Sequence, residues 1–425
     1  KAITELGKLY EYGLGVKEDK QMAFKLYQKA DNFGDPEGSY RLGLCYLKGP
    51  NAIPEKAAAL FEKAAALEFT DAKLQLGLMF LKGDSVTRDT QRAAKLFKEA
   101  SDSGNVEASV ELGKCYMDGT GIQPNKKNAF KLFKDAKQKK SLSGTFRLAK
   151  CYQKGIEEVV KRSYANAFEL FFDLHKKNYT PGTFELATCY LEGNGTDQNL
   201  DIGFNLLNQA VNKEFPKALN FLGQCYLNGK LGHVDKAKAV ELFEKAADAG
   251  CKLAKVNLAQ CLIDGTGIEK NEQEGFKLLQ EVSDSSSAAK LRIGICLLKG
   301  AGVTKNEKEG LALIQKAAHV DKDPSAMCYY AKLLYAGEDV PKNEDEAINL
   351  FLESSKEGNS EAKLQLALIY EKSENEMDQF KVEPLLIESS KGGNSKASYH
   401  IGMRLMKDKN RKEEAIKYLN KAAKY

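Results

Sequence analysis

Small and apolar residues recur along the whole chain with a period of about 36 residues, and this pattern predicts its architecture. In most copies a leucine precedes a small residue, and an aromatic or aliphatic residue follows three positions later. Successive small residues lie 34 to 38 positions apart. They are Gly7, Gly43, Gly77, Gly113, Ala149, Ala187, Gly223, Ala259, Gly294, Ala331, Ala367 and Gly402. Self-similarity at this period is typical of stacked units, each of which needs its neighbours to bury an apolar face.

Each copy predicts a pair of α-helices. In the fourth copy, Leu112, Gly113 and Tyr116 lie on one face of a first helix, so bulky side chains stand beside a gap that lets another helix approach closely. The second half of each copy places small, leucine, aromatic or aliphatic, and small residues at i, i+3, i+4 and i+7. One such run is Ala239, Leu242, Phe243 and Ala246. This spacing predicts the core-facing stripe of a second helix.

Residues with capping preferences mark the helix ends. Most first helices are followed by a glycine, which adopts a left-handed cap at little cost. These glycines are Gly13, Gly49, Gly83, Gly119, Gly155, Gly193, Gly229, Gly265, Gly300 and Gly337. Eight second helices follow an expected N-cap, namely Asp19, Asp89, Asn125, Asn199, Asp235, Asn271, Asn306 or Asn343. Glu274, Glu309 and Glu346 lie three positions after three of these N-caps, which predicts capping boxes.

We therefore predict an all-α solenoid of about twelve helix-turn-helix repeats in a single domain over residues 1–425. The expected repeats start near residues 1, 37, 71, 107, 143, 181, 217, 253, 288, 325, 361 and 396. The loop between Gly155 and Ala167 is two residues longer than its counterparts, and we expect such an irregularity to mark a bend or a cap. The first helix and the last, from Arg411 to Tyr425, lack a polar outer face, so we expect an excerpt of a longer chain.

The segment LGKCYMDGTGIQPNKKNAFKLFKDA, which begins at Leu112, resembles the Sel1-like repeats, relatives of the tetratricopeptide repeats. The shared features are the Leu-Gly-x-x-Tyr block, the Gly-x-Gly turn and a second helix that ends in a run such as Lys-Ala-Ala. They cover essentially the whole chain. The resemblance implies a right-handed α/α superhelix that acts as an adaptor, as in membrane-protein degradation complexes, signalling assemblies and bacterial secretion-related proteins. The chain departs from the family in having no Trp, which alters packing volume and not architecture.

Composition and charge narrow the classes of partner. Hydrophobic residues make up 43% of the chain and charged residues 29%. No apolar run approaches the ~18 residues that a membrane span needs. The net charge of +5 is the small difference between 64 basic and 59 acidic residues. Because acids are interspersed with bases, the sequence argues against a nucleic-acid partner, which requires a basic excess on one face.

Seven of the nine cysteines share one repeat position, two residues after the small residue. They are Cys45, Cys115, Cys151, Cys189, Cys225, Cys261 and Cys296. Stacked helices lie about 8 to 10 Å apart, whereas a disulfide needs Cα atoms within about 7 Å, so we expect buried free thiols. Free thiols favour a cytoplasmic location. Two glycosylation sequons, at Asn178 and Asn194, leave the ER lumen open as an alternative.

No constellation of residues predicts catalysis, a cofactor or a metal site. Ser287 to Lys290 and Ser360 to Lys363 match the Ser-x-x-Lys motif of penicillin-recognising enzymes, but the partner motifs Ser-Asp-Asn and Lys-Thr-Gly do not occur in the sequence. The four histidines lie in different repeats at unrelated positions, which argues against a metal cluster or a catalytic dyad. The Gly-x-Gly turns follow no predicted strand and lack the lysine of a phosphate loop. We therefore predict a protein that is not an enzyme and takes no cofactor.

By analogy with tetratricopeptide grooves, the first helices line a concave surface. Three positions face it, which lie three before, one after and four after the small residue. In the second and third repeats all of these positions are apolar, and they are Tyr40, Leu44, Leu47, Leu74, Leu78 and Leu81. One interpretation is a groove that binds an amphipathic helix or a peptide of a partner. The other is tighter packing between repeats, because a leucine stripe at helical spacing is more often core than site.

These observations lead to three hypotheses. The first is a non-enzymatic scaffold or adaptor that presents a concave superhelical surface to protein or peptide partners in a multiprotein complex, without nucleic acid and without direct membrane insertion. The second is the regulatory repeat array of a longer signalling enzyme such as a kinase, or of a ubiquitin-ligase or ER-degradation complex. The third is a structural component bound along a cytoskeletal assembly, which rests on the extended fold alone.

Overall fold

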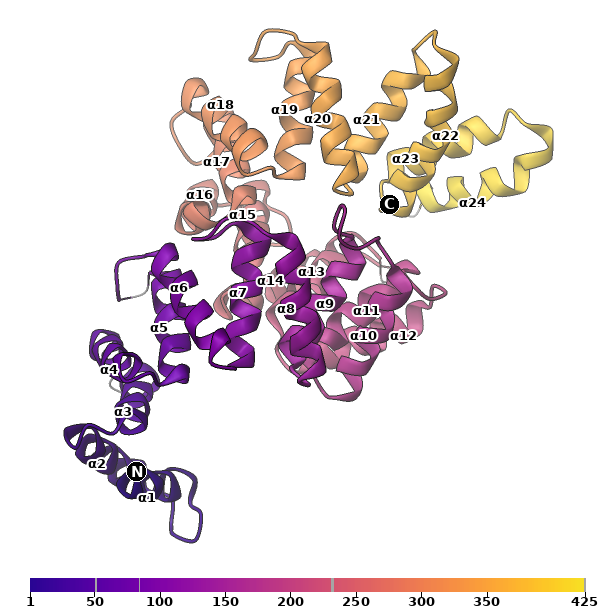
Figure 1. Ribbon diagram of the computed structural model, residues 1–425. Coiled ribbons are helices and arrows are strands. Elements are labelled where there is room, and N and C mark those ends of the chain that lie inside the picture. Colours follow the sequence, from indigo (N-terminus) through magenta and orange to yellow (C-terminus); the bar gives the residue numbers. More distant parts are fainter. Residues whose placement is uncertain (50–51, 84, 231–232, 424–425) are drawn as a thin grey trace. The chain divides into compact units, whose positions relative to one another are not determined.

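Pairs of α-helices follow one another along the chain (Figure 1). The computed structural model describes residues 1–49, 52–83, 85–230 and 233–423. In these ranges the first helices are α1 (Ala2–Tyr12), α3 (Pro36–Lys48), α5 (Thr70–Lys82), α7 (Val106–Asp118), α9 (Leu142–Lys154), α11 (Thr180–Glu192), α13 (Pro216–Leu227), α15 (Lys252–Asp264), α17 (Ser287–Lys299), α19 (Pro324–Ala336), α21 (Ser360–Glu371) and α23 (Ser395–Leu405). The second helices are α2 (Lys20–Asn32), α4 (Pro54–Ala66), α6 (Thr90–Asp102), α8 (Lys126–Gln138), α10 (Tyr164–Lys176), α12 (Leu200–Asn212), α14 (Lys236–Asp248), α16 (Glu272–Val282), α18 (Glu307–Gln315), α20 (Glu344–Lys356), α22 (Glu376–Lys391) and α24 (Lys412–Ala423). The expected all-α fold of helix-turn-helix repeats is confirmed.

The chain divides into two compact units, residues 1–203 and 204–425. Within each unit consecutive helices pack against one another, as α5 does against α6 in the first unit and α15 against α16 in the second. Short turns of 3-10 helix at Ser283–Ser285 and Lys409–Arg411, and a π turn at Lys316–Val320, interrupt the regular pattern. The arrangement of all the repeats as one right-handed superhelix over residues 1–425 stays a prediction.

The tightest packing within a pair joins the small residue of the first helix to an aromatic ring of the second. Phe97 on α6 is fully buried, and its ring lies against the backbone of Gly77 on α5. A Cβ atom at position 77 would lie 2.6 Å from Cε1 of Phe97, well inside van der Waals contact. The same contact joins Gly7 to Tyr27, Gly43 to Phe61, Gly113 to Phe133 and Gly223 to Phe243. The gap predicted beside the bulky residues is therefore filled by a ring of the partner helix.

Two hydrogen bonds hold the start of the second helices. All eight predicted N-cap side chains accept from a backbone N–H three positions on, as Asn125 does from Asn128 at 3.0 Å. In addition, the backbone N–H of Asn125 donates to the carbonyl oxygen of Tyr116 on the first helix at 2.8 Å. Equivalent bonds join Asp89 to Phe80 and Asp235 to Tyr226. This second bond closes the loop between the two helices of a pair.

The predicted capping boxes are wrong. A capping box requires the glutamate to accept from the backbone N–H of the N-cap residue. That N–H is already used, because Asn306 donates it to the carbonyl oxygen of Leu297 at 2.9 Å. Glu309 and Glu346 instead accept from the side-chain amides of Asn306 and Asn343, at 2.8 and 2.9 Å. The loop-closing bond therefore takes precedence over the local box.

Glycine ends the first helices almost as predicted. Seven of the ten glycines are left-handed C-caps. Gly155 and Gly229 also have positive φ values, of 74° and 65°, but the ψ of 159° places Gly155 outside the left-handed helical region, and α13 is capped by Asn228 before Gly229. Gly49 differs most, because its φ of −74° and ψ of 167° are extended. Pro50 follows it in the sequence, and a proline pushes the preceding residue into the extended region. The prediction of a left-handed cap is therefore wrong at Gly49 and at Gly155.

The longer loop of the fifth repeat is absorbed locally. Between α9 and α10 the N–H of Ile156 donates to the carbonyl oxygen of Val160 at 2.8 Å, which folds the extra residues into a turn of their own. Ser163 then caps α10 and donates its N–H to the carbonyl oxygen of Tyr152 on α9 at 2.8 Å. Shorter loops make the same closing bond, so the insertion leaves the pairing of the two helices unchanged.

The cysteines are free thiols. Six of the seven at the repeated position are buried, and Cys45 is half-buried. Burial raises the pKa of Cys115 to about 11 and that of Cys189 to about 12, because a thiolate is poorly solvated in an apolar core. The prediction of buried free thiols is thus confirmed, with partial exposure at Cys45.

We predict that Gly77→Ala destabilises the protein, although alanine favours a helix over glycine by about 1 kcal/mol. The added methyl group collides with the Phe97 ring, and overpacking of a core costs about 1–3 kcal/mol. Phe97→Leu in the same chain should recover part of the loss, because it makes room for the methyl group. Urea unfolding followed by circular dichroism measures both proteins. A Gly77→Ala protein more stable than the parent would contradict the ring contact.

We predict that the buried thiols resist alkylation at mildly alkaline pH while the chain is folded. Their folded pKa of about 11 to 12 lies above the ordinary value of 9.0, so their neutral form stabilises the fold fully below the ordinary value. This contribution is lost as the pH rises through the folded values. Mass spectrometry after iodoacetamide treatment should find the half-buried Cys251 modified first and the buried cysteines only in urea. Equal labelling of Cys189 and Cys251 in the folded protein would overturn this expectation.

Candidate functional site

The six apolar residues proposed as a groove lie together in the first unit. They are Tyr40, Leu44 and Leu47 on α3, and Leu74, Leu78 and Leu81 on α5. All six are half-buried, and all pack against one core cluster formed by α4, α5, α6 and α7. The structure therefore brings together the residues that the sequence pattern selected. Whether each of them serves packing or docking depends on its position in the repeat.

The position three residues before the small residue favours the packing interpretation. The ring of Tyr40 contacts the rings of Phe61 and Phe69, with centroid distances of 5.8 and 5.2 Å. Burial raises the pKa of the Tyr40 hydroxyl. Most residues at this position in other repeats are buried, among them Val110, Val256 and Leu364. Tyr40 and Leu74 therefore contribute chiefly to the contact between repeats.

The position one residue after the small residue is at the surface. We call these positions the inner row, which comprises Lys8, Leu44, Leu78, Lys114, Lys150, Thr188, Gln224, Gln260, Ile295, Lys332, Leu368 and Met403. The first eleven are half-buried and the last is exposed. Lysines in the row have acidic partners, such as Glu185 for Lys150 at 3.1 Å and Glu361 for Lys332 at 2.5 Å. Because charged residues are accommodated there, core packing does not require Leu44 and Leu78 to be apolar.

The position four residues after the small residue is mixed. Its occupants include the buried Ile263 and Leu298 as well as the polar Gln153 and Glu371. Leu47 and Leu81 extend the apolar surface of Leu44 and Leu78 toward the C-terminal ends of α3 and α5.

A cationic side chain lies next to Leu44. The guanidinium of Arg41 donates to the hydroxyl of Tyr12 at 3.1 Å and lies 3.7 Å from the carboxylates of Glu11 and Glu37. Its Nε atom is buried and donates no hydrogen bond to the described residues. Its contacts with Tyr12 and Glu11 hold the guanidinium against α1.

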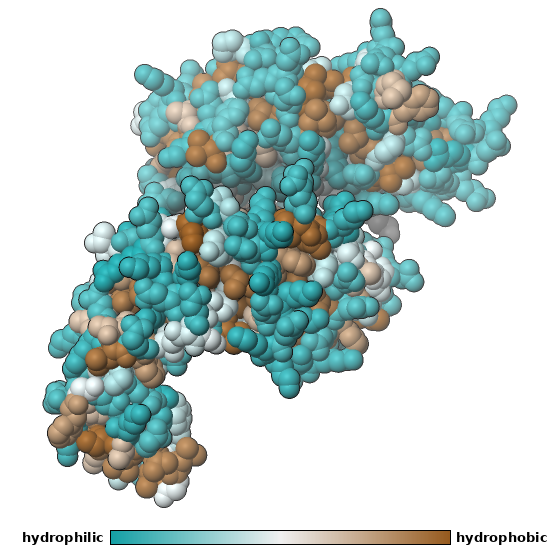
Figure 2. Space-filling model, viewed as in Figure 1, coloured by the Kyte–Doolittle hydropathy of each residue, from teal (hydrophilic) through white to brown (hydrophobic). Residues whose placement is uncertain are grey.

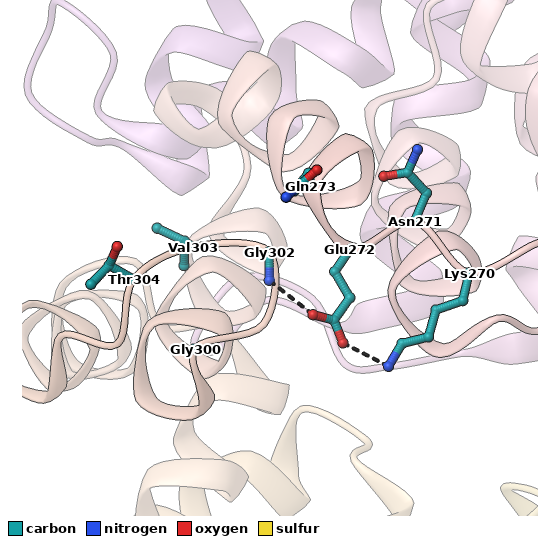
Figure 3. Close-up of a pocket in the computed structure, with 8 residues that line it drawn as sticks. All are labelled: Lys270, Asn271, Glu272, Gln273, Gly300, Gly302, Val303 and Thr304. Atoms are coloured by element: carbon teal, nitrogen blue, oxygen red, sulfur yellow. Dashed lines mark hydrogen bonds and ion pairs between the residues drawn. The ribbon is translucent and has the colours of Figure 1, made fainter.

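In the second unit a Gly-x-Gly turn borders a polar hollow and contacts the helix of the preceding repeat (Figure 3). Residues 270–273 at the start of α16 and residues of the turn after α17 line it. Glu272 accepts a hydrogen bond from the N–H of Gly302 at 3.1 Å and pairs with Lys270 at 2.7 Å. A Cβ atom on Gly302 would collide with the carbonyl oxygen of Glu272. The turn therefore connects one repeat to the next. The N–H of Gly302, which a phosphate would need as a donor, is already bound by the carboxylate of Glu272.

The described ranges contain neither a metal-ligand cluster nor a membrane-spanning helix. No group of three or more His, Cys, Asp or Glu side chains there is placed to hold a metal ion. No helix in the same ranges is long and apolar enough to cross a bilayer.

A local concentration of positive charge on α8 is hidden in the nearly balanced charge of the whole chain. The face drawn in Figure 2 is mostly hydrophilic, with apolar residues in small separate patches. On α8 the side chains of Lys126, Lys127, Lys131, Lys134 and Lys137 are all exposed, and Asp135 is the single acid of that helix. A count of charges helix by helix would have found this cluster.

A family model described as the Sel1 repeat matches most of the chain. The matched residues are 1–30, 36–69, 70–105, 106–140, 143–172, 181–214, 216–251, 253–284, 287–319, 324–359 and 396–424. These eleven matches leave out the pair formed by α21 and α22. Helix α22 has 16 residues and contains Pro384, so its sequence departs from the pattern of the other second helices.

Two solved structures and one curated protein are similar to the chain. The c5321 protein, a protective antigen present in uropathogenic Escherichia coli strains and displaying an SLR fold, is 23% identical, with a TM-score of 0.44 over 99% of this chain and 90% of that one. A Sel1 repeat protein from Oxalobacter formigenes is 20% identical, with a TM-score of 0.40 over 73% of this chain and 89% of that one. Chitin synthase regulatory factor 3 of Schizosaccharomyces pombe is 32% identical over 85 residues, which are 19% of this chain and only 9% of that relative.

We predict that the inner row tolerates charge and the core does not. Leu44→Glu places a carboxylate three residues after Arg41, and Leu78→Glu places one four residues before Lys82, so each gains a favourable helix neighbour. We expect each change to cost less than about 1.5 kcal/mol of folding stability. Leu76→Glu buries an unpaired charge at a position that is 2% exposed, and should cost about 3–5 kcal/mol. Thermal unfolding compares the three, and equal losses would assign Leu44 and Leu78 to the core.

Proposed function

The chain belongs to the Sel1 repeat family, and from this premise we propose that it is a non-enzymatic scaffold or adaptor that binds protein or peptide partners in a multiprotein complex. Repeat arrays of stacked helix pairs offer extended surfaces for such partners. The proposed binding surface is the groove formed by Tyr40, Leu44, Leu47, Leu74, Leu78 and Leu81 on α3 and α5.

The observation that carries this proposal is the placement of Leu44 and Leu78. Both are half-buried members of the inner row, where other repeats hold lysine with an acidic partner. Two apolar side chains on consecutive repeats, at positions that folding does not require to be apolar, are best explained by a binding role. Surface leucines of this kind lose water when an apolar partner covers them, which contributes about 25 cal/mol per Å² of apolar area.

The chemistry around the two leucines favours an amphipathic helix as the partner. Such a helix presents apolar residues at i, i+3, i+4 and i+7, and it docks by laying this stripe into an apolar groove. Because the Arg41 guanidinium already contacts Tyr12, Glu11 and Glu37, the apolar stripe supplies the main attraction for the partner.

A second candidate function is a regulatory component of an enzyme assembly. The similarity to a protein named chitin synthase regulatory factor 3 favours it. Since the match covers 9% of that protein, it supports a regulatory class of role and no particular enzyme. In this version the array still binds segments of other proteins and performs no chemistry of its own, and the identity of the captured partners distinguishes it from a general adaptor.

We further propose that the protein works in the cytoplasm. The support is the repeated buried cysteine, which suits a reducing compartment where thiols persist. The partners we expect there are proteins and not nucleic acids, because the charge of the whole chain is nearly balanced.

We predict that Leu44→Glu combined with Leu78→Glu weakens the capture of native partners by about tenfold or more, because charged side chains then face the partner's apolar stripe. The matched control combines Ile295→Glu with Leu368→Glu. These residues hold the same inner-row position in the second unit, and the new carboxylates also gain helix neighbours, Arg292 and Lys372. Affinity capture from the native cells, quantified by mass spectrometry, compares both proteins after circular dichroism has shown intact helices. Identical partner sets for parent, variant and control would exclude the groove.

A further inference from the structure

A second surface of the first unit carries a concentrated positive charge. We call it the basic face and define it as Lys95 and Lys98 on α6 with Lys127, Lys131 and Lys134 on α8. All five side chains are exposed. Lys95 and Lys98 occupy the same repeat positions as Lys131 and Lys134, 36 residues later. The stacking of equivalent units therefore places these two pairs on the same side of consecutive second helices.

The charge of the basic face is only partly offset by neighbouring acids. Asp102 and Asp135 lie four residues after Lys98 and Lys131, whereas Glu99, four residues after Lys95, pairs with Lys73 at 3.0 Å. No lysine of the basic face forms an ion pair with a described residue. Like charges at i and i+3 or i+4 destabilise a helix, and α8 repeats this spacing along its exposed side. The cluster is thus a cost to folding that an external anion would relieve.

The residue types of the basic face indicate which class of anionic partner it suits: lipid, nucleic acid, phosphate or carboxylate. No described residue between Leu67 and Tyr164 is an exposed large apolar side chain. Peripheral membrane binding combines lysine with apolar side chains that enter the lipid, and single-stranded nucleic acids are held by stacked aromatic rings. Recognition of phosphate groups favours the planar fork of arginine, whereas all five cations here are lysine. The basic face therefore best suits a partner with flexible carboxylate side chains, which the lysine ammonium groups attract.

We propose that the basic face binds an acidic, conformationally flexible segment of a protein partner, rich in Asp and Glu. Helix α8 has 13 residues, which gives it a length of about 20 Å, enough for an extended segment of about six residues. Lys126 and Lys137 extend the charge toward both ends of the helix. The proposal goes beyond the groove on α3 and α5, because it uses other residues and a long-range electrostatic force in place of apolar burial.

The test measures binding of a fluorescein-labelled peptide of mixed Glu and Asp to the full chain by fluorescence anisotropy, at low and at physiological salt. Lys127→Gln, Lys131→Gln and Lys134→Gln together should weaken binding about tenfold and reduce its salt dependence. The matched control combines Lys308→Gln, Lys316→Gln and Lys356→Gln. It removes the same charge from exposed lysines at the second helices of the second unit, and it should bind within about twofold of the parent.

Three outcomes would overturn the proposal. Equal weakening by variant and control would show a response to net charge alone. Tighter binding of phosphatidylserine vesicles or of polyuridylate than of the peptide, lost in the variant and kept in the control, would assign the face to lipid or RNA. Loss of the peptide by the Leu44→Glu and Leu78→Glu protein would show that the groove, and not a separate face, holds it. Circular dichroism of every variant confirms that the exposed changes leave the helices intact.

Discussion

The contact between an aromatic ring and a residue without a side chain sets the distance between the two helices of many pairs. Phe97 lies against Gly77 so closely that a single Cβ atom would not fit. Where the small residue is alanine, the ring's position holds Leu207 in the repeat of Ala187 and Leu279 in that of Ala259, but Phe171 in that of Ala149 and Phe351 in that of Ala331. Each pair is thus packed closely around one buried side chain of the second helix, as expected in an interior of crystal-like density.

This framework leaves some positions of the first helix without a structural task. The small residue receives the ring, the leucine before it and the cysteine after it fill the core, and a backbone carbonyl of the last turns accepts the bond that closes the loop. The inner row lies at the half-buried margin of these contacts, and it holds lysine, glutamine, threonine or an aliphatic residue from one repeat to the next. We therefore expect variation at such positions to change what the surface binds more than how the chain folds, and the proposed groove rests on Leu44 and Leu78 for this reason.

Periodicity was sufficient to predict the helices, their caps and the burial of the thiols, because each depends on contacts within one or two repeats. The capping boxes at Asn306 and Asn343 failed for a different reason. The N-cap amide binds a carbonyl on another helix, and a local motif does not register that competition. Gly49 shows the opposite error: a glycine after a first helix usually forms a left-handed cap, but Pro50 next to it in the sequence favours the extended conformation. Sequence also selected six groove residues as a set, whereas burial separated Tyr40 and Leu74 from the inner row. The positive charge of α8 can be predicted from the sequence, but only when the charges are counted for each helix separately.

The loop between α9 and α10 has a consequence for how such chains change length. Its additional residues bond to one another at Ile156 and Val160, while the bond from Ser163 to Tyr152 keeps the two helices in register. The packing of the two helices therefore depends on the hydrogen bond at the ends of the loop and not on the residues between them. Such a loop tolerates insertions. A segment with a new activity can therefore be added to one repeat while the other repeats keep their geometry.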